Sequence, residues 1–288
     1  MTSMDVATRS EGGLQVKSSE IQAEVQAAAV LAMQRPRDEL ASWERIATSC
    51  GRPLFADGAE YEYERGHSVV RGPSVKLARE MARCWGNIRY GIRVVSMTEE
   101  EVQIEGWAWD LQTNNRVSSE ARFGRKVQRR QGQETVWVAA DERNLRELIN
   151  KHGAIAVRNA LLQLLPPDMV ESAVRMCRRT VAGAAQEKLN NDRDGTMARV
   201  TSAWRRHGVT PEMLEKKLDK PLDNFTGEDV ATLRSWYQSV ADGNSDPSEY
   251  FDLAMERAKD AAAELEGAGA KPAPKKKAAK KKAAPDAD

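Results

Sequence analysis

The chain has 288 residues, and 41% of them are hydrophobic, enough for one large domain or two modest ones. No stretch approaches the roughly 18 consecutive apolar residues of a membrane-spanning helix, and the first residues lack the apolar segment of a secretion signal. We therefore expect a cytoplasmic protein. Its three cysteines, Cys50, Cys84 and Cys177, are widely separated, which predicts reduced, buried thiols and argues against a disulfide framework.

The net charge of +1 conceals a segregation of charge along the chain. The last 18 residues contain 7 Lys and 2 Asp, which leaves a net charge of −4 for the rest. The segment from Arg65 to Arg130, however, contains 13 basic and 7 acidic residues. Positive charge is thus concentrated in this segment and in the tail, a pattern typical of proteins that bind polyanions.

The first fifty residues predict an arm and two helices. Residues 1–18 are polar and aperiodic, so we expect a flexible arm. Ser19 and Gln22 form a capping box that starts a helix. A second helix is expected from Pro36, which is preorganised for a first helical turn, to a stop near Gly51.

The next segment predicts a helix followed by strands. Extended structure is expected from Leu54, with a hairpin turn at Asp57-Gly58. An amphipathic helix follows from Pro73 to Trp85. Alternating and apolar runs then predict three antiparallel strands and a short edge strand: Ile88–Met97, Val102–Leu111, Val117–Gln128 and Glu134–Ala140.

Beyond Asp141 the pattern is helical. Two helices are expected to end at Gly153 and Pro166, and a third to complete the core before a boundary within Asn190–Gly195. About three more helices follow, with N-caps at Thr210 and Thr226. The fold class is therefore α+β, a small antiparallel sheet packed with helices plus a helical C-terminal module. The expected divisions are an arm (1–18), a core (19–190), the module (191–262) and a disordered Lys/Ala/Pro-rich tail (263–288).

Cationic side chains recur on the Pro73–Trp85 helix and on the strand after it. Lys76, Arg79 and Arg83 lie on one helix face, and the spacing of four places Arg89 and Arg93 on one strand face. Together they predict a continuous cationic surface that binds phosphates. Further candidates on the same segment are Arg71, Arg122, Arg125, Lys126, Arg129 and Arg130.

Aromatic residues are interleaved with these cations. Trp107 and Trp109 share a strand face, and Tyr90 lies between two arginines. A basic track for phosphates combined with aromatic faces for bases is typical of proteins that bind single-stranded nucleic acid. All three are therefore base-stacking candidates. The alternative is that they pack in the core, as expected for Trp85.

The cations also have an ordinary structural interpretation. Glu80 is placed to pair with Lys76 one turn away, which would make the helix face a solvated one. Lysines and arginines also protect exposed strand edges from pairing with other chains.

No catalytic motif emerges, and we expect neither an enzyme nor a cofactor. The three histidines show no metal-ligand spacing, and there is no phosphate-binding loop or nucleophile elbow. Asp110, followed by Glu120 and Arg122, faintly resembles a nuclease metal site, although the expected lysine is missing. A metal-dependent nuclease therefore remains an alternative.

Four segments resemble phage recombination proteins of the RecT/Redβ type, which anneal complementary single strands. They are "GPSVKLAREMARCWGNIRYGIRVV", the "GWAWDLQTN" of the strand region, the basic "RFGRKVQRR" and "GAIAVRNALLQLLP". The resemblance covers about Glu20 to Lys188, and the family has a core of sheet and helix. It implies annealing without ATP in the host cytoplasm, by homo-oligomeric rings or filaments.

The resemblance also implies where DNA and partners bind. The family holds the DNA backbone in a cationic groove, a role that would fall to the cations named above together with Lys151 and Arg158. Its C-terminal module commonly docks a single-strand-binding protein or a partner exonuclease. The Lys-rich tail is not a general family feature, so it is expected either to tether nucleic acid or to aid solubility. An oligomeric phage structural or adaptor protein remains a second alternative.

Overall fold

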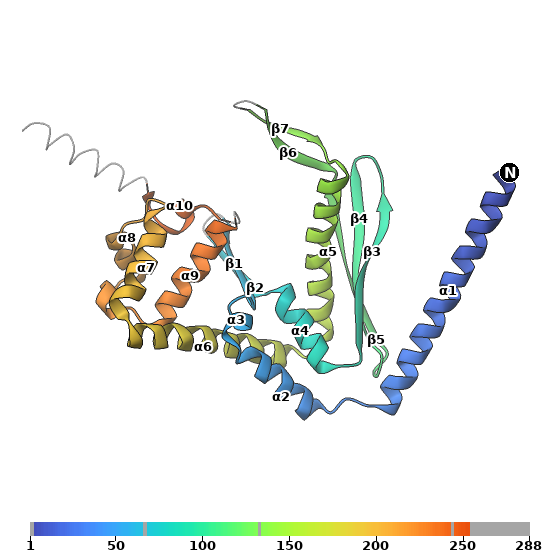
Figure 1. The fold of residues 1–288 in the computed structure, drawn as a ribbon, viewed down its shortest axis with the longest axis horizontal. Helices are drawn as coiled ribbons and strands as arrows, with labels where there is room; N and C mark the ends of the chain where they lie inside the picture. The colour runs from blue at the N-terminus through green and yellow to red at the C-terminus, as the bar shows by residue number, and fades with distance from the viewer. Residues whose placement is uncertain (1–2, 66–67, 132–133, 243–244, 254–288) are drawn as a thin grey trace, which may run out of the picture.

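The computed structural model describes residues 3–65, 68–131, 134–242 and 245–253. The fold is α+β, as expected. A three-stranded sheet carries one long helix, α5, on one face, and a mainly helical body is built around α6 and α9 (Figure 1). Within the described ranges, no helix has the length and apolar character needed to cross a membrane.

The N-terminal helices begin at other residues than expected. Helix α1 spans Ser3–Gln34, so the expected arm and the start at Ser19 are wrong from Ser3 onward; no proline interrupts this stretch. Helix α2 spans Glu39–Cys50 rather than starting at Pro36. The carboxylate of Asp38 accepts the Ala41 N–H at 3.0 Å and so sets the first turn.

A short helix and a hairpin precede α4. The Asp57 N–H donates to the Pro53 carbonyl, so Asp57-Gly58 closes a helical turn and is not the expected hairpin turn. The chain between the two strands, residues 66–67, lies outside the described residues. Ser74 caps α4 by accepting the Leu77 N–H at 3.2 Å. The elements are α3 (Pro53–Ala56), β1 (Glu60–Arg65), β2 (Ser68–Pro73) and α4 (Val75–Trp85).

The expected third strand divides into two. Its first part joins an antiparallel sheet of order β3-β4-β5, and its second part forms a separate hairpin. The division falls at Arg125, whose N–H donates to the Glu100 carbonyl at 2.8 Å and turns the chain out of the sheet. The strands are β3 (Ile88–Met97), β4 (Glu101–Asp110), β5 (Asn115–Gly124), β6 (Lys126–Gln131) and β7 (Glu134–Ala139).

Helix α5 is continuous from Glu142 to Leu164, so the expected break at Gly153 is wrong. This glycine is buried where the helix crosses Ile92, and a Cβ there would lie 3.0 Å from the Ile92 Cδ1 atom. At Gly106 of β4 the approach is closer, because a Cβ would lie 2.3 Å from the Ala156 carbonyl carbon. The helix backbone therefore rests almost directly on the strand.

The C-terminal module shares a core with α6. Ala185 and Leu189 of α6 belong to one buried cluster with Trp204, Phe225 and Leu233, although only Asp192 separates α6 from α7 at the expected boundary. Thr210 and Thr226 occupy the expected N-cap positions, and the Thr226 hydroxyl accepts the Asp229 N–H. The helices are α6 (Pro167–Asn191), α7 (Arg193–Arg205), α8 (Pro211–Leu218), a 3-10 turn (Leu222–Asn224), α9 (Gly227–Ala241) and α10 (Pro247–Tyr250).

A second cluster joins α2, α4 and α6. Cys50, Cys84 and Cys177 are all buried within it as free thiols, which confirms the expectation for the cysteines. The Lys/Ala/Pro-rich tail at 263–288 lies outside the described residues.

Candidate nucleic-acid interface

The three-stranded sheet has one covered face and one open face. On β4, Val102, Ile104 and Ala108 are buried on the side of α5. Because successive side chains of a strand point to opposite faces, Trp107 and Trp109 lie on the other side. Both are only half-buried.

The strand register brings cations beside these tryptophans. Trp109 has Arg89 of β3 directly opposite on one side and Arg116 of β5 on the other. At the far end of the same face, Arg122 lies opposite Gln103, and Arg93 lies opposite Glu105. We call this set the open face: Arg89, Arg93, Trp107, Trp109, Arg116 and Arg122.

The two tryptophans are held in defined positions. The Trp107 ring lies against Gly91, where a Cβ would come within 3.0 Å of it. The Arg116 guanidinium lies 5.8 Å from the centre of the Trp107 ring. The Trp109 Nε1–H donates to the Asn114 side chain at 3.2 Å. Both rings therefore have a fixed orientation and a partly exposed surface, as a stacking platform requires.

The arginines of the open face differ in how they are neutralised. Arg89 pairs with Glu24 of α1 at 2.7 Å, which places α1 beside this end of the sheet. Arg93 pairs with Glu105. Arg116 and Arg122 are exposed and have no carboxylate partner in the described parts of the chain. These two are the cations most available to phosphate groups.

The α4 cations lie on the opposite side of the sheet. Ala78 and Ala82 of α4 belong to the same buried cluster as Ala108 and Val157, so α4 packs on the side of α5. The expected continuous surface of helix and strand cations is therefore wrong. Lys76, Arg79 and Arg83 cannot join Arg89 and Arg93 in one groove of this subunit.

Two of the α4 cations are also engaged locally. Lys76 donates to the carbonyls of Leu54 (3.1 Å) and Phe55 (3.2 Å). Arg83, rather than Lys76, pairs with Glu80, and both of its bonds are 2.8 Å long. Bonding from Arg83, with help from Ser49 and Arg52, lowers the pKa of Glu80 to about 2. Arg79 is exposed without a described partner.

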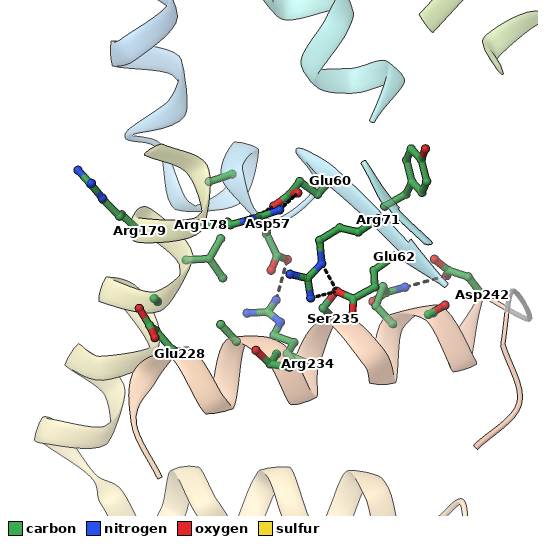
Figure 2. A pocket seen from close by; sticks show the side chains of 18 residues that line it. Asp57, Glu60, Glu62, Arg71, Arg178, Arg179, Glu228, Arg234, Ser235 and Asp242 are labelled. Atoms are coloured by element: carbon green, nitrogen blue, oxygen red, sulfur yellow. Dashed lines mark hydrogen bonds and ion pairs between the residues drawn. The ribbon is translucent and has the colours of Figure 1, made fainter. Parts of the chain in front are cut away.

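Arg71 lies in a different place, at a cavity of 460 Å³ between the β1–β2 hairpin, α6 and α9 (Figure 2). It pairs with Glu62 at 2.8 Å, and the same carboxylate accepts the Trp236 indole N–H at 2.8 Å. Arg178–Glu60 and Arg234–Asp57 are further ion pairs at this cavity. Its charges are mostly satisfied, so it is better described as a polar junction between hairpin and module.

The remaining predicted cations are dispersed. Arg125 donates to the Thr98 carbonyl at 2.6 Å, and Arg129 pairs with Asp141 at 3.0 Å. Lys126 and Lys151 are exposed, and the side chain of Arg130 lies outside the described residues. The Arg158 guanidinium stacks on Tyr61 at 4.6 Å.

Tyr90 does not join the tryptophans. It lies opposite Ala108 in the register, so its side chain is on the α5 side of the sheet. Its prediction as a base-stacking residue of the open face is therefore wrong. Successive side chains of a strand point to opposite faces, so Tyr90 and the pair Arg89 and Arg93 lie on different faces of the sheet.

Two residues of interest were not predicted. Arg116 follows the turn after β4, and its even spacing from Arg122 could have placed it on the same strand face. Trp137 of β7 is 64% exposed, on a hairpin that projects beyond the end of the sheet (Figure 1). No sequence signal distinguishes this tryptophan from one buried in a core.

The carboxylate that suggested a nuclease is engaged in the structure. Asp110 is buried, pairs with Arg37 at 2.8 Å and accepts the Gln112 N–H at 3.0 Å. Within the described ranges, no group of three or more His, Cys, Asp or Glu side chains is arranged to hold a metal ion. The observation behind the nuclease alternative thus has a structural explanation.

Comparisons with protein-family models, with curated proteins and with solved structures find no match.

Proposed function

We propose that the protein binds single-stranded DNA on the open face of the β3-β4-β5 sheet and promotes annealing of complementary strands without ATP. It would act as a homo-oligomer in phage recombination and repair, in the cytoplasm of a bacterial host. The single observation that carries the proposal is the Arg89–Trp109–Arg116 row, in which an aromatic platform has a cation on each side.

The proposed mechanism is physical. Pairing of complementary strands is favourable, but repulsion between two polyanions and the search for register slow it. Arginines that neutralise phosphates release counterions and reduce the repulsion. A strand held extended, with its base edges exposed, loses less conformational entropy on pairing. Several subunits on one strand multiply weak sites, and the protein makes and breaks no covalent bond.

The direct test is an annealing assay. Purified protein is mixed with complementary labelled oligonucleotides in the absence of ATP and magnesium, and duplex formation is compared with the protein-free rate. We expect faster annealing and a binding constant that falls steeply with salt. An unchanged annealing rate together with no binding at moderate salt would refute the proposal and favour a structural or adaptor protein.

We further propose that the module docks a partner protein, a single-strand-binding protein or an exonuclease. The supporting observation is a second cavity of 390 Å³ where α3 and α6 meet α7 and α9. Its lining includes Trp204 and Tyr237 as well as the 90% exposed Leu54, and Lys188 and Arg199 lie at its edge. An apolar hollow with cations beside it suits a partner segment that combines apolar and acidic side chains.

A further inference from the structure

The β3 edge of the sheet carries an apolar surface that α5 does not cover. On the α5 side of β3, Ile92, Val94 and Met97 are 41%, 42% and 48% exposed. Ile155 of α5 is 38% exposed and belongs to the same side of the sheet. Large aliphatic side chains grouped in this way indicate a contact surface.

The cause is an offset of α5 toward the other edge. The helix crosses β4 at Gly106 and covers β5, where Phe123 is buried and stacks on His152 at 4.2 Å. On β3 it touches Ile92 through Gly153 and leaves Val94 and Met97 uncovered, whereas Ile88 at the start of the strand packs against the core. The covering layer is therefore displaced by about one strand from the sheet below it.

Both outer edges of this sheet lack a partner in the described parts of the chain. The order β3-β4-β5 leaves the outer backbone groups of β3 and of β5 without a strand to pair with. Such edges readily accept another strand. A bulge between Val94 and Ser96 interrupts the regular pairing of β3, so the regular segment Ile88–Val94 is the part of this edge best suited to pairing.

We propose that a second copy of this chain occupies the β3 edge, and that it does so with its own β5 edge. This deepens the self-assembly in the proposed function, because it names the two surfaces that meet. In a second copy placed in this way, α5 covers β5, so this helix comes next to the exposed side chains of Ile92, Val94 and Met97 in the first copy. Helix α5 of one subunit would then cover the apolar side chains that α5 of its neighbour leaves exposed.

The same geometry argues against a symmetric pairing of two β3 edges. A two-fold arrangement would place two uncovered rows side by side and leave both α5 helices on the far sides. The β3–β5 contact is heterologous, so it repeats and produces a ring or a filament. It also continues the sheet, so that the open faces of successive subunits form one surface along which a single strand could run.

Helix α1 supports the choice of this edge. It leaves the body on the β3 side of the sheet, and its N-terminal part points away from the rest of the chain (Figure 1). Ile21 and Leu31 are 59% and 54% exposed. A neighbour at the β3 edge would lie beside this helix and could cover these side chains as well.

The first test is disruption of the row. Ile92→Glu with Val94→Glu is expected to convert an assembly larger than the 32.0 kDa chain into monomers, measured by chromatography with light scattering in the absence of DNA. Leu40→Glu is the control, because it charges an aliphatic residue of α2 that is 70% exposed and lies outside the proposed contact surfaces, and it should leave the assembly unchanged. A monomeric wild-type protein, or a double variant that assembles normally, would overturn the proposal.

The second test does not depend on how well these variants fold. Ser96→Cys on β3 and Ser118→Cys on β5, both exposed on the open face of the sheet, are combined in one chain and treated with a short bismaleimide. We expect a ladder of covalent oligomers from the double variant and none from either single variant. A dimer from Ser96→Cys alone would show the symmetric arrangement and overturn the proposal, as would the absence of a ladder. Assembly without DNA binding would leave this inference standing and refute only the proposed function.

Discussion

Arg37 and Asp110 form a buried ion pair that joins the linker after α1 to the end of β4. The guanidinium and the carboxylate are 2.8 Å apart, and their side chains are 4% and 8% exposed. Arg37 also donates to the carbonyls of Trp85 and Gly86, both at 3.0 Å, and stacks on the Trp85 ring. One side chain thus connects the N-terminal helices, the end of α4 and the sheet.

The first prediction concerns this pair. Arg37→Met should lower the free energy of unfolding by about 3–5 kcal/mol, because it leaves the Asp110 carboxylate buried without a counter-ion. Urea unfolding followed by circular dichroism measures the change. Adding Asp110→Asn should restore part of the loss, and a single variant as stable as the wild type would show that the pair is not a structural element.

The second prediction separates the open face from α4. Arg116→Glu with Arg122→Glu should weaken binding of a labelled oligonucleotide by at least tenfold and reduce its salt dependence, because two phosphate contacts become repulsive. Arg79→Glu with Arg83→Glu changes the net charge equally on the other side of the sheet and should have a much smaller effect. Equal losses in fluorescence anisotropy titrations would point to a nonspecific effect of net charge.

The third prediction concerns Gly106. Gly106→Ala should destabilise the protein by several kcal/mol, since its Cβ would overlap the α5 backbone and overpacking typically costs about 1–3 kcal/mol or more. Gly183 of α6 has open space around it, so Gly183→Ala should stabilise the helix by about 0.5–1 kcal/mol. Thermal unfolding of both variants compares them; similar midpoints would contradict the close crossing.

The fourth prediction is a pH dependence at Glu80. Its pKa is lowered to about 2, first by hydrogen bonds from Arg83, from an ordinary value of about 4.3. The ionised carboxylate of Glu80 therefore contributes its full share to the free energy of unfolding at pH values above its ordinary pKa. This contribution is lost as the pH falls toward 2. Glu80→Gln should cost about 1–2 kcal/mol at pH 7, a figure reduced for the exposed partners, and almost nothing near pH 2. A constant difference across urea titrations at several pH values would be inconsistent with this assignment.

The fifth prediction concerns the module. Lys188→Glu with Leu54→Glu should reduce capture of the cognate single-strand-binding protein severalfold while leaving annealing of naked strands unchanged. Both side chains are exposed at the edge of the apolar cavity, so folding should be preserved. Removal of the whole module is a poorer test, because it would uncover Ala185 and Leu189 of the shared core. Loss of annealing on naked strands would contradict the division of roles.

The sequence predicted local structure better than it predicted which surfaces meet. The amphipathic pattern of α4, the alternation of β3 and β4 and the caps at Thr210 and Thr226 are local signals, and the structure contains these elements. Element ends are predicted less accurately, because glycine commonly ends a helix, whereas Gly153 lies inside α5 and allows a close contact with Ile92.

The candidate site was predicted only in part. Alternation placed Arg89 with Arg93, and Trp107 with Trp109, on common strand faces, as the register shows. Whether α4 lies on the same side as these residues depends on which face of the sheet α5 covers. That is decided by tertiary packing between distant segments, for which periodicity carries no information.

The position of Glu62 has a consequence for communication across the molecule. Its side chain is 5% exposed and is shared between Arg71 and the Trp236 indole. An anion that bound Arg71 in place of Glu62 would leave the buried Glu62 carboxylate with neutral hydrogen-bond donors alone. This would weaken the contact between the β1–β2 hairpin and α9. Linkage is reciprocal, so a protein that pulls the module outward would in turn release Arg71, and the fluorescence of Trp236 would register either event.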